Sequence, residues 1–312
     1  MTPAGQKTTV SVVIPVHNRP ELIVRCLDSV AAQTVLPDRL IVVDNASTDN
    51  TRSEIEKWAQ AHKDSRLEIR IADEARPGAP AARNRGLDSV DSEFVVFFDS
   101  DDVMRSYLIA ELHRTIEANP DNDIYAWKSM VRCVSGRTYQ RKFIGRDLWS
   151  SQIYHAFLST QCYAVRTSVL VASGKWNENL PCWNDWELGI RLMLKGARVC
   201  GIDKVLADIY PQNESITGTD YSSRAGLWEK AIEASEADIK ASDHKDVARF
   251  VDMMYYRRAS LAALYRREGN NDLAAPLLAN ALRPYKGIRR FLLRTTYLLT
   301  SRGIRGAYLL WV

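Results

Sequence analysis

The sequence predicts an α/β fold, in which a mostly parallel central sheet is flanked by helices and followed by an all-helical C-terminal extension. Apolar runs rich in Val, Ile and Phe occur at residues 10–16, 40–43 and 94–98, and residues 67–71 alternate between apolar and charged side chains; segments with helical spacing separate these strands. Such alternation with short loops is typical of parallel strands joined by right-handed crossovers. From residue 226 onward only helical patterns follow.

The first helices are predicted from their start signals. Pro20 opens one of them, because the missing N–H of proline is harmless at the first helical position. Asp49 precedes a helix at 51–61, and Arg76-Pro77-Gly78 turns the chain into an Ala-rich helix at 79–87. For the second half the patterns predict, in order, a helix at 107–119, a hairpin of strands at 124–134 and 137–144, a strand at 161–165, a helix at 185–194 and a strand at 199–210.

The composition is that of an ordinary globular protein, with 26% charged and 46% hydrophobic residues. The five cysteines show no CxxC spacing, so we expect buried thiols in a reducing cytosol rather than a disulfide framework or a zinc site. The N-terminus lacks the basic and then apolar pattern of a signal peptide. No run reaches the roughly 18 apolar residues of a spanning helix. We predict a cytoplasmic protein, soluble or peripheral on the inner face of the cell membrane.

Three carboxylates, Asp99, Asp101 and Asp102, follow the apolar run at 94–98 without a neighbouring cation in the sequence. Like charges this close resist joint ionisation unless a cation or strong hydrogen-bond donors offset them. Hard carboxylate oxygens suit Mg²⁺ or Mn²⁺, with phosphate oxygens and water completing the shell. The alternative is a turn that caps the helix at 107–119, since Asp caps helices well. These residues alone do not separate the two interpretations.

Polar clusters also follow the first two strands, His17-Asn18-Arg19 after one and Asp44-Asn45 after the other. In parallel sheets ligands bind outside the carboxyl ends of the strands, so this convergence favours a site. Asp44 could accept hydrogen bonds from a nucleobase or a ribose, or could simply form an Asx-turn. Arg83 could bind diphosphate oxygens through its planar guanidinium, or could lie on a solvated helix face.

A third acidic feature opens the helix predicted at 185–194. Asp185 and Glu187 alternate there with Trp183 and Trp186. One carboxylate could act as a general base, and the tryptophans could offer a flat face to a sugar ring. Acidic residues in a first turn also complement the helix dipole, and this alternative is strong for Glu187.

Several function classes are disfavoured by missing motifs. The sequence has no HxxxH or HExxH spacing, no GxGxxG after the first strand, no GxxxxGK[ST] and no GxSxG. We therefore do not expect a zinc hydrolase, a dehydrogenase, a P-loop NTPase or a hydrolase with a nucleophile elbow.

With these residues placed, the chain resembles the family-2 glycosyltransferases, which have the GT-A fold. The resemblance covers about residues 8–220. Five motifs carry it in the family's order and spacing: VVIPVHNR at 12–19, VVDNASTD at 42–49, ARNRG at 82–86, DSDD at 99–102 and NDWE at 184–187. The resemblance implies a nucleotide-diphosphate-sugar donor, usually UDP-linked, and inversion at the anomeric carbon.

The resemblance also implies which residues meet the donor and a metal ion. The donor would be contacted by Pro15, His17 and Arg19 along the nucleotide, Asp44 at its base, Arg83 at the ribose or diphosphate, Asp99 at the ribose or sugar, and Ser100. Asp101, joined by Asp102 as a second ligand, would hold Mn²⁺ or Mg²⁺ against the diphosphate.

The acceptor side follows from the last motif. Asp185 matches the family's general base, which draws the proton from an acceptor hydroxyl as it attacks. Trp183, Trp186 and Glu187 would contact the acceptor or its sugar.

Three positions depart from the family pattern. Asn184 stands where Glu is frequent, which leaves the base in place but makes its neighbour neutral. His17 stands where an aromatic Tyr is usual. Asn213 stands where a late His is common, and if that His contacts metal or diphosphate, metal affinity would be weaker here.

The chain is predicted to contain a GT-A domain at 1–224, with a nucleotide-binding half at about 8–105 and an acceptor-binding half at about 106–224. We predict a metal-dependent inverting hexosyl- or N-acetylhexosaminyltransferase that acts on a surface glycan or glycolipid. One alternative is a non-catalytic nucleotide-sugar-binding or scaffold protein that works through its helical tail. Another, a sugar-phosphate nucleotidyltransferase, would need a Gly- and Arg-rich loop where His17-Asn18-Arg19-Pro20 stands.

The remaining segment, 225–312, is predicted to be a helical extension with a basic, aromatic tail. No acidic residue follows Asp272, whereas 283–312 carries seven basic ones, Arg283, Lys286, Arg289, Arg290, Arg294, Arg302 and Arg305. This pattern fits a helix on an anionic membrane surface, or a helix docked on the domain with its arginines in solvent. Nucleic acid is not an expected partner, because no DNA- or RNA-binding module precedes the tail.

Overall fold

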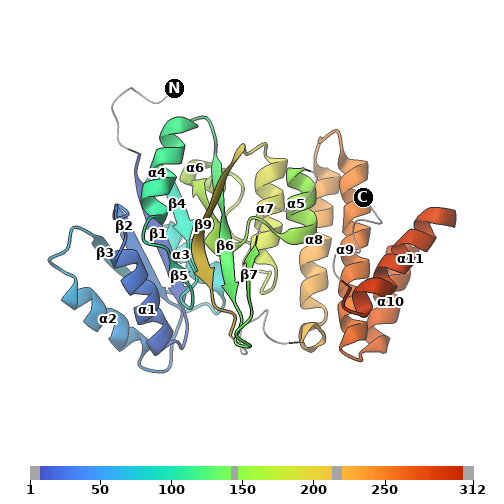
Figure 1. The fold of residues 1–312 in the computed structure, drawn as a ribbon, viewed down its shortest axis with the longest axis horizontal. Helices are drawn as coiled ribbons and strands as arrows, with labels where there is room; N and C mark the ends of the chain where they lie inside the picture. The colour runs from blue at the N-terminus through green and yellow to red at the C-terminus, as the bar shows by residue number, and fades with distance from the viewer. Residues whose placement is uncertain (1–7, 142–146, 213–219, 305–312) are drawn as a thin grey trace. The chain divides into compact units, whose positions relative to one another are not determined.

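The computed structural model describes residues 8–141, 147–212 and 220–304 of the chain (Figure 1). Contacts between Cα atoms divide them into two compact units. The first unit consists of residues 8–141, 157–181 and 195–212, and the second of residues 147–156, 182–194 and 220–304. The second unit therefore includes residues 147–156, 182–194 and 220–224, all of which belong to the predicted acceptor-binding half. A functional boundary at residue 224 stays a prediction.

The first unit is built on a sheet that contains, within the described residues, nine strands. Their order is β3-β2-β1-β4-β8-β6-β9-β5, with β7 paired to β6. The strands are β1 (Val10–Val16), β2 (Arg39–Asp44), β3 (Glu68–Asp73), β4 (Phe94–Phe97), β5 (Val103–Met104), β6 (Ile124–Arg132), β7 (Thr138–Arg141), β8 (Tyr163–Arg166) and β9 (Val199–Ile209). Strands β1, β2, β3 and β4 pair with one another in parallel, and β6 is parallel to β9. The pairs β4–β8, β6–β8, β6–β7 and β5–β9 are antiparallel. The predicted α/β fold with a central sheet is confirmed; the sheet is parallel from β3 to β4 and mixed beyond β4.

Helices cover both faces of the parallel half of the sheet. The helices of this unit are α1 (Pro20–Ala31), α2 (Thr51–Ala61), α3 (Ala79–Leu87), α4 (Leu108–Ala118), α6 (Thr167–Ala172) and the 3-10 turn η1 (Thr160–Cys162). Ile14 of β1 shares one apolar core with Leu27 of α1 and Ile55 of α2. Val13 points to the opposite face, where it meets α3. Each crossover therefore buries one side of β1, which explains the continuous apolar run.

The second unit is helical in its described residues. Its helices are α5 (Leu148–His155), α7 (Asn184–Leu194), α8 (Leu227–Ala241), α9 (Val247–Arg267), α10 (Asn271–Leu282), α11 (Gly287–Ser301) and the 3-10 turn η2 (Tyr221–Arg224). The side chain of Glu229 accepts a hydrogen bond from the Gly226 N–H and caps α8. Tyr297 of α11 packs against Ala262 and Ala263 of α9. The predicted helical extension is confirmed for its described part, in which no helix is long and apolar enough to cross a membrane.

Helix α3 lies unusually close to the sheet at Gly86. A Cβ atom at this position would stand 2.4 Å from Cγ1 of Val13 and 3.1 Å from Cγ2 of Val43. Both valines are fully buried in strands, and β-branched side chains have little freedom to move aside. Gly86 therefore fixes the distance between α3 and the sheet.

The variant Gly86→Ala is expected to lower the free energy of unfolding by about 1–3 kcal/mol, the usual effect of overpacking. Helix propensity alone would favour Ala by about 1 kcal/mol, so the sign of the change shows which effect dominates. Urea unfolding measures it. Arg85→Ala, at an exposed position of the same helix, is the control and should stay within about 0.5 kcal/mol of wild type. A stabilised Gly86→Ala variant would contradict the close approach.

Candidate functional site

The predicted donor residues gather at the carboxyl edge of the parallel strands. Strand β1 has β2 on one side and β4 on the other, so the strand order reverses between β1 and β4. Ligands of open α/β sheets bind at such a reversal. The segment 17–19 follows β1, and residues 99–102, which we call the acidic turn, follow β4. Asp44 ends β2, and the structure thus brings the three polar clusters to one edge.

Two carboxylates of the acidic turn are matched by nearby donors. Asp99 accepts hydrogen bonds from Nη2 of Arg83 and from Nε2 of Gln161, both at 2.8 Å. Asp101 forms an ion pair with Arg19, from the loop that follows β1. The guanidinium groups therefore offset part of the negative charge that the sequence concentrates here.

Asp102 is anchored through both of its oxygens. Oδ1 accepts a hydrogen bond from the backbone N–H of Tyr210 at 2.8 Å, and Oδ2 accepts one from Gln161. Only 2% of the residue is exposed. Burial, followed by repulsion from Asp101 and Asp99, raises the pKa of Asp102 well above its usual range. This carboxyl group ties the end of β9 to the acidic turn.

Asp101 stands where added positive charge is favourable. It is 8% exposed, and burial followed by repulsion from Asp99 raises its pKa, while Arg19 acts in the opposite direction. A cation next to Asp101 stabilises its ionised form. Asp101 differs from Asp99 and Asp102 in that its cationic partner, Arg19, comes from the loop after β1.

Two of the predicted donor residues are enclosed by the protein. Pro15 is buried within β1, where it pairs with Val43 of β2. Ser100 is 5% exposed within the acidic turn. Both shape the edge of the sheet.

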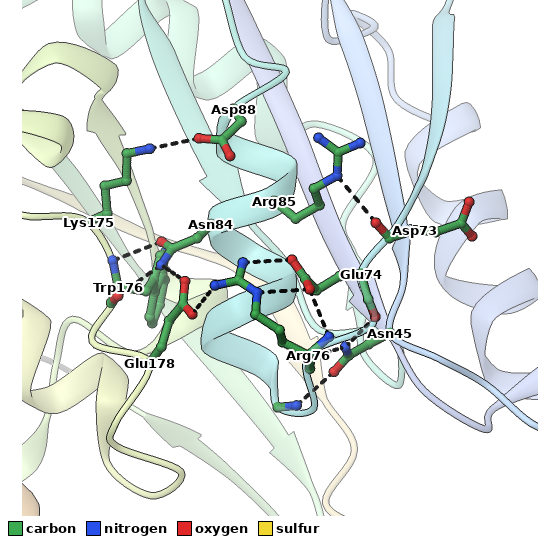
Figure 2. Close-up of polar contacts among 11 residues, drawn as sticks. Asn45, Asp73, Glu74, Arg76, Asn84, Arg85, Asp88, Lys175, Trp176 and Glu178 are labelled. Atoms are coloured by element: carbon green, nitrogen blue, oxygen red, sulfur yellow. Dashed lines mark hydrogen bonds and ion pairs between the residues drawn. The ribbon is translucent and has the colours of Figure 1, made fainter.

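Asn45 organises the loops beside the predicted base-binding position. Its side chain donates to the carbonyl oxygens of Glu74 and Arg76 and accepts from the N–H of Gly78, which joins the end of β2 to the start of α3 (Figure 2). A ring nitrogen of His17 lies 2.8 Å from the Asn45 carbonyl oxygen. His17 itself is exposed and is available to a ligand.

Asp44 has the features of both of its predicted roles. Its Oδ1 accepts a hydrogen bond from the N–H of Ser47 at 3.3 Å, as in an Asx-turn. The residue is 6% exposed at the end of β2. A contact between Asp44 and a nucleobase stays a prediction.

Arg83 lies between the acidic turn and a segment that comes much later in the chain. It is 5% exposed, so it does not belong to a solvated helix face. Besides its contact with Asp99, its guanidinium carbon lies 4.4 Å from the ring centroid of Trp176. The adjacent residue, Asn84, exchanges hydrogen bonds with the backbone of Trp176 (Figure 2).

The sequence analysis missed three residues of this site. Gln161 and Tyr210 stand at the ends of predicted strands, and no predicted element includes Trp176. A single Gln at the start of a strand was the only local signal for the first, and the other two gave none. Asn213 lies outside the described residues.

The predicted base belongs to the second unit. Asp185 lies in the first turn of α7 and is partly exposed, and its Oδ1 accepts a hydrogen bond from the N–H of Trp186 at 2.8 Å. Trp183, directly before α7, has a φ of 49°, which is rare for a bulky residue. The guanidinium carbon of Arg257 lies 4.0 Å from the Trp183 ring centroid. The joining of Asp185 and the acidic turn in one active site stays a prediction.

Burial argues against direct acceptor contact by two of the predicted residues. Trp186 is fully buried, and its Nε1 donates to the carbonyl oxygen of Ile153 on α5 at 3.2 Å. Glu187 is 1% exposed and paired with Arg191, and burial raises its pKa. Both are interior residues of their unit, so the prediction of acceptor contact is kept for Trp183 only.

The acidic turn offers a small donor set for a divalent cation. Among the described residues, no three His, Cys, Asp or Glu side chains form a group that could hold a metal ion. Mg²⁺ usually needs only one or two carboxylates when phosphate oxygens and water supply the remainder. Asp101 fits this role, whereas Asp102 already accepts hydrogen bonds on both oxygens.

The fold and the clustered strand ends define an α/β protein with a candidate ligand site at its topological switch point. A sequence profile described as Glycosyl transferase family 2 matches residues 11–170, which is more than half of the 312 residues. The chain belongs to this family.

Curated relatives match over parts of their length. Glycosyltransferase GlyG of Streptococcus pneumoniae is 29% identical over 108 residues, which cover 35% of each chain. Glycosyltransferase AglE of Haloferax volcanii is 39% identical over 94 residues, 30% of each chain. The poly(ribitol-phosphate) beta-glucosyltransferase of Bacillus spizizenii is 31% identical over 130 residues, 41% of this chain and 20% of that protein. The chain thus spans about a third or less of the length of these relatives.

Solved structures share the fold over almost the whole chain. TarS 1-349 of S. aureus in complex with UDP-GlcNAc has a TM-score of 0.71 at 20% identity, covering 96% of this chain and 89% of that one. The mannosyltransferase PcManGT of Pyrobaculum calidifontis in complex with GDP-Man and Mn²⁺ has a TM-score of 0.62 at 18% identity, covering 98% and 86%. The predicted GT-A fold is confirmed.

Replacing Gln161 by Leu is expected to lower the free energy of unfolding by about 1–3 kcal/mol, because Asp99 and the buried Asp102 then each lose a hydrogen-bond donor. Urea unfolding of the ligand-free protein measures the change. The matched control is Gln60→Leu at an exposed position of α2, which should change stability by less than about 0.5 kcal/mol. Equal effects of the two variants would contradict the anchoring of the acidic turn by Gln161.

Proposed function

We propose that this protein is a metal-dependent inverting glycosyltransferase, which moves a hexosyl or N-acetylhexosaminyl group from a nucleotide-diphosphate donor, UDP-linked, to a hydroxyl of a surface glycan or glycolipid. The observation that carries the proposal is the meeting of Arg19, Arg83 and the acidic turn at the switch point of the sheet. Family membership supports transfer chemistry. The bound UDP-GlcNAc of TarS and GDP-Man of PcManGT support this choice of donor class.

The donor diphosphate would be received by cations that now pair with carboxylates. Arg83 presents a buried planar guanidinium, whose geometry suits phosphate oxygens. Arg19 is less enclosed and can exchange its carboxylate for a phosphate oxygen. Asp44 and His17 would line the nucleotide, and Asp99 would accept from a ribose or sugar hydroxyl.

Asp101 would ligate Mn²⁺ or Mg²⁺, with Asp102 holding the turn in place. When bound, the ion would supply positive charge to the leaving diphosphate, which gains negative charge in the transition state. The residues of the chain orient the donor around it. Arg19 and Arg83 exclude free rotation of the diphosphate, and the buried turn restricts water near the anomeric carbon.

Asp185 would act as the general base. It would take the proton of the acceptor hydroxyl while that oxygen bonds to the anomeric carbon and the bond to the diphosphate oxygen breaks. A single in-line displacement of this kind inverts the anomeric carbon and needs no enzyme nucleophile. The alternative, a nucleotide-sugar-binding or scaffold protein that works through its helical tail, would bind the donor without this step.

Asp185→Asn is expected to reduce nucleotide release from the donor by about 100- to 10,000-fold, the usual contribution of a general base. A panel of nucleotide sugars, screened by thermal shift with and without Mn²⁺, first identifies the donor. Released nucleotide is then measured with that donor, and donor affinity should remain unchanged in the variant.

Asp243→Asn, an exposed aspartate of the second unit, is the matched control. Donor binding without turnover in the wild type, or full turnover in Asp185→Asn, would contradict the proposed catalysis. Absence of a thermal shift with every donor would count against the whole assignment.

We further propose that the tail segment 283–312 contacts an anionic membrane surface through α11. Ile288 and Phe291 are 68% and 63% exposed and lie three residues apart, on one side of the helix. Arg290 and Arg294 are exposed next to them, and neither has an acidic partner among the described residues. Exposed apolar side chains beside unneutralised cations favour adsorption to anionic lipid.

Flotation of the full chain with vesicles tests this contact. Binding to vesicles that contain phosphatidylglycerol should exceed binding to pure phosphatidylcholine, fall with salt, and drop at least about tenfold in Arg290→Glu/Arg294→Glu. Lys63→Glu/Arg66→Glu makes the same charge change at exposed residues of the first unit and should bind like wild type. Equal flotation of both double variants would contradict a role for α11.

A further inference from the structure

Trp176 is a buried aromatic residue in a loop, and its ring lies beneath the guanidinium of Arg83. The residue is 2% exposed, and the Arg83 guanidinium carbon is 4.4 Å from the ring centroid. The ring also meets Phe97, the last residue of β4, edge to face at 5.2 Å between centroids. Trp176 therefore touches both the strand that leads into the acidic turn and the arginine that contacts it.

Asn84, the residue after Arg83, fixes the position of this loop. Its Oδ1 accepts a hydrogen bond from the N–H of Trp176 at 3.0 Å, and its Nδ2 donates to the Trp176 carbonyl oxygen at 3.0 Å. Nδ2 also donates to Glu178 at 2.8 Å (Figure 2). The Asn84 side chain thus holds the backbone of the loop at Trp176, while the guanidinium of Arg83 lies over the Trp176 ring.

A second connection ties the same loop to the end of β2. Glu178 forms an ion pair with Arg76, which also pairs with Glu74 at 2.8 Å (Figure 2). The carbonyl oxygen of Arg76 accepts a hydrogen bond from Asn45, directly after Asp44. The loop at 174–178 is therefore connected to two of the strand ends that form the candidate site.

We propose that Trp176 is a positioning residue for Arg83, and that through it the loop at 174–178 sets the affinity for the diphosphate part of the donor. This inference rests on the proposed function, in which Arg83 receives the diphosphate. A guanidinium with one face on an aromatic ring keeps its plane fixed, while its N–H groups at the edge stay directed at oxygens. Without the ring, Arg83 must be ordered by the ligand itself, and affinity falls accordingly.

A double-mutant cycle tests whether Trp176 acts through Arg83. Ligand-observed NMR measures the affinities for UDP and for uridine, which lacks the phosphates. Trp176→Leu should weaken UDP binding about 2- to 30-fold, the range expected for a cation–π contact, and change uridine binding less than about twofold. In the Arg83→Ala background the same substitution should change UDP binding by less than about twofold.

Trp176→Phe keeps a ring face and should retain UDP affinity within about threefold of wild type, as a positioning role requires. Trp176→Met, which has no ring, replaces the Leu variant if that variant does not fold. Equal weakening of UDP and uridine, or equal effects in both backgrounds, would show a merely structural residue and overturn the inference. Unchanged UDP affinity in Arg83→Ala would overturn the inference about Trp176 but not the proposal that the protein binds a nucleotide-sugar donor. A wild-type protein that binds neither UDP nor GDP would overturn the proposed function as well.

Discussion

The gathering of three carboxylates at the end of one strand, two of them buried, is the constraint on which the first unit depends. A buried carboxylate without partners is unfavourable by several kcal/mol, so each must be matched by donors. Asp99 takes its donors from α3 and η1, and Asp102 takes its donors from η1 and the end of β9. These segments are far apart in sequence. They reach the turn only when the parallel half of the sheet and the antiparallel additions to it are both formed.

The parts of this arrangement that local sequence patterns encode could be predicted. Strand β1 is buried throughout because α1 and α3 cover its two faces, and its run of apolar residues, interrupted only by Ser11, is visible without a structure. The strand ends could be placed at one edge because parallel strands share their direction. The partners could not be predicted. Gln161 reaches the acidic turn because the strand after it, β8, pairs antiparallel with β4, and no local pattern specifies that pairing.

The prediction for the acceptor side failed at Trp186 and Glu187 for a related reason. The prediction assumed that the protein covers only one side of this helix. In that case acidic and aromatic residues at its start would form an exposed binding face. The sequence analysis predicted no helix at 148–155, yet α5 lies there, and Ile153 accepts the indole hydrogen bond of Trp186. With Leu188 and Ile190 also fully buried, α7 is an interior helix of its unit. The error arose because helix α5 was not predicted, and not because the residue types of Trp186 and Glu187 were misinterpreted.

The location of Asp185 in the second unit agrees with the chemistry proposed for it. A general base must be ionised before the acceptor hydroxyl arrives, and a carboxylate added to a like-charged cluster tends to keep its proton. Burial, and after it repulsion within the acidic turn, raises the pKa of both Asp101 and Asp102. A base built into that turn would therefore ionise less readily than an isolated carboxylate. Under the proposed function, the acidic turn would bind the cation, and Asp185, in the first turn of α7, would act as the base.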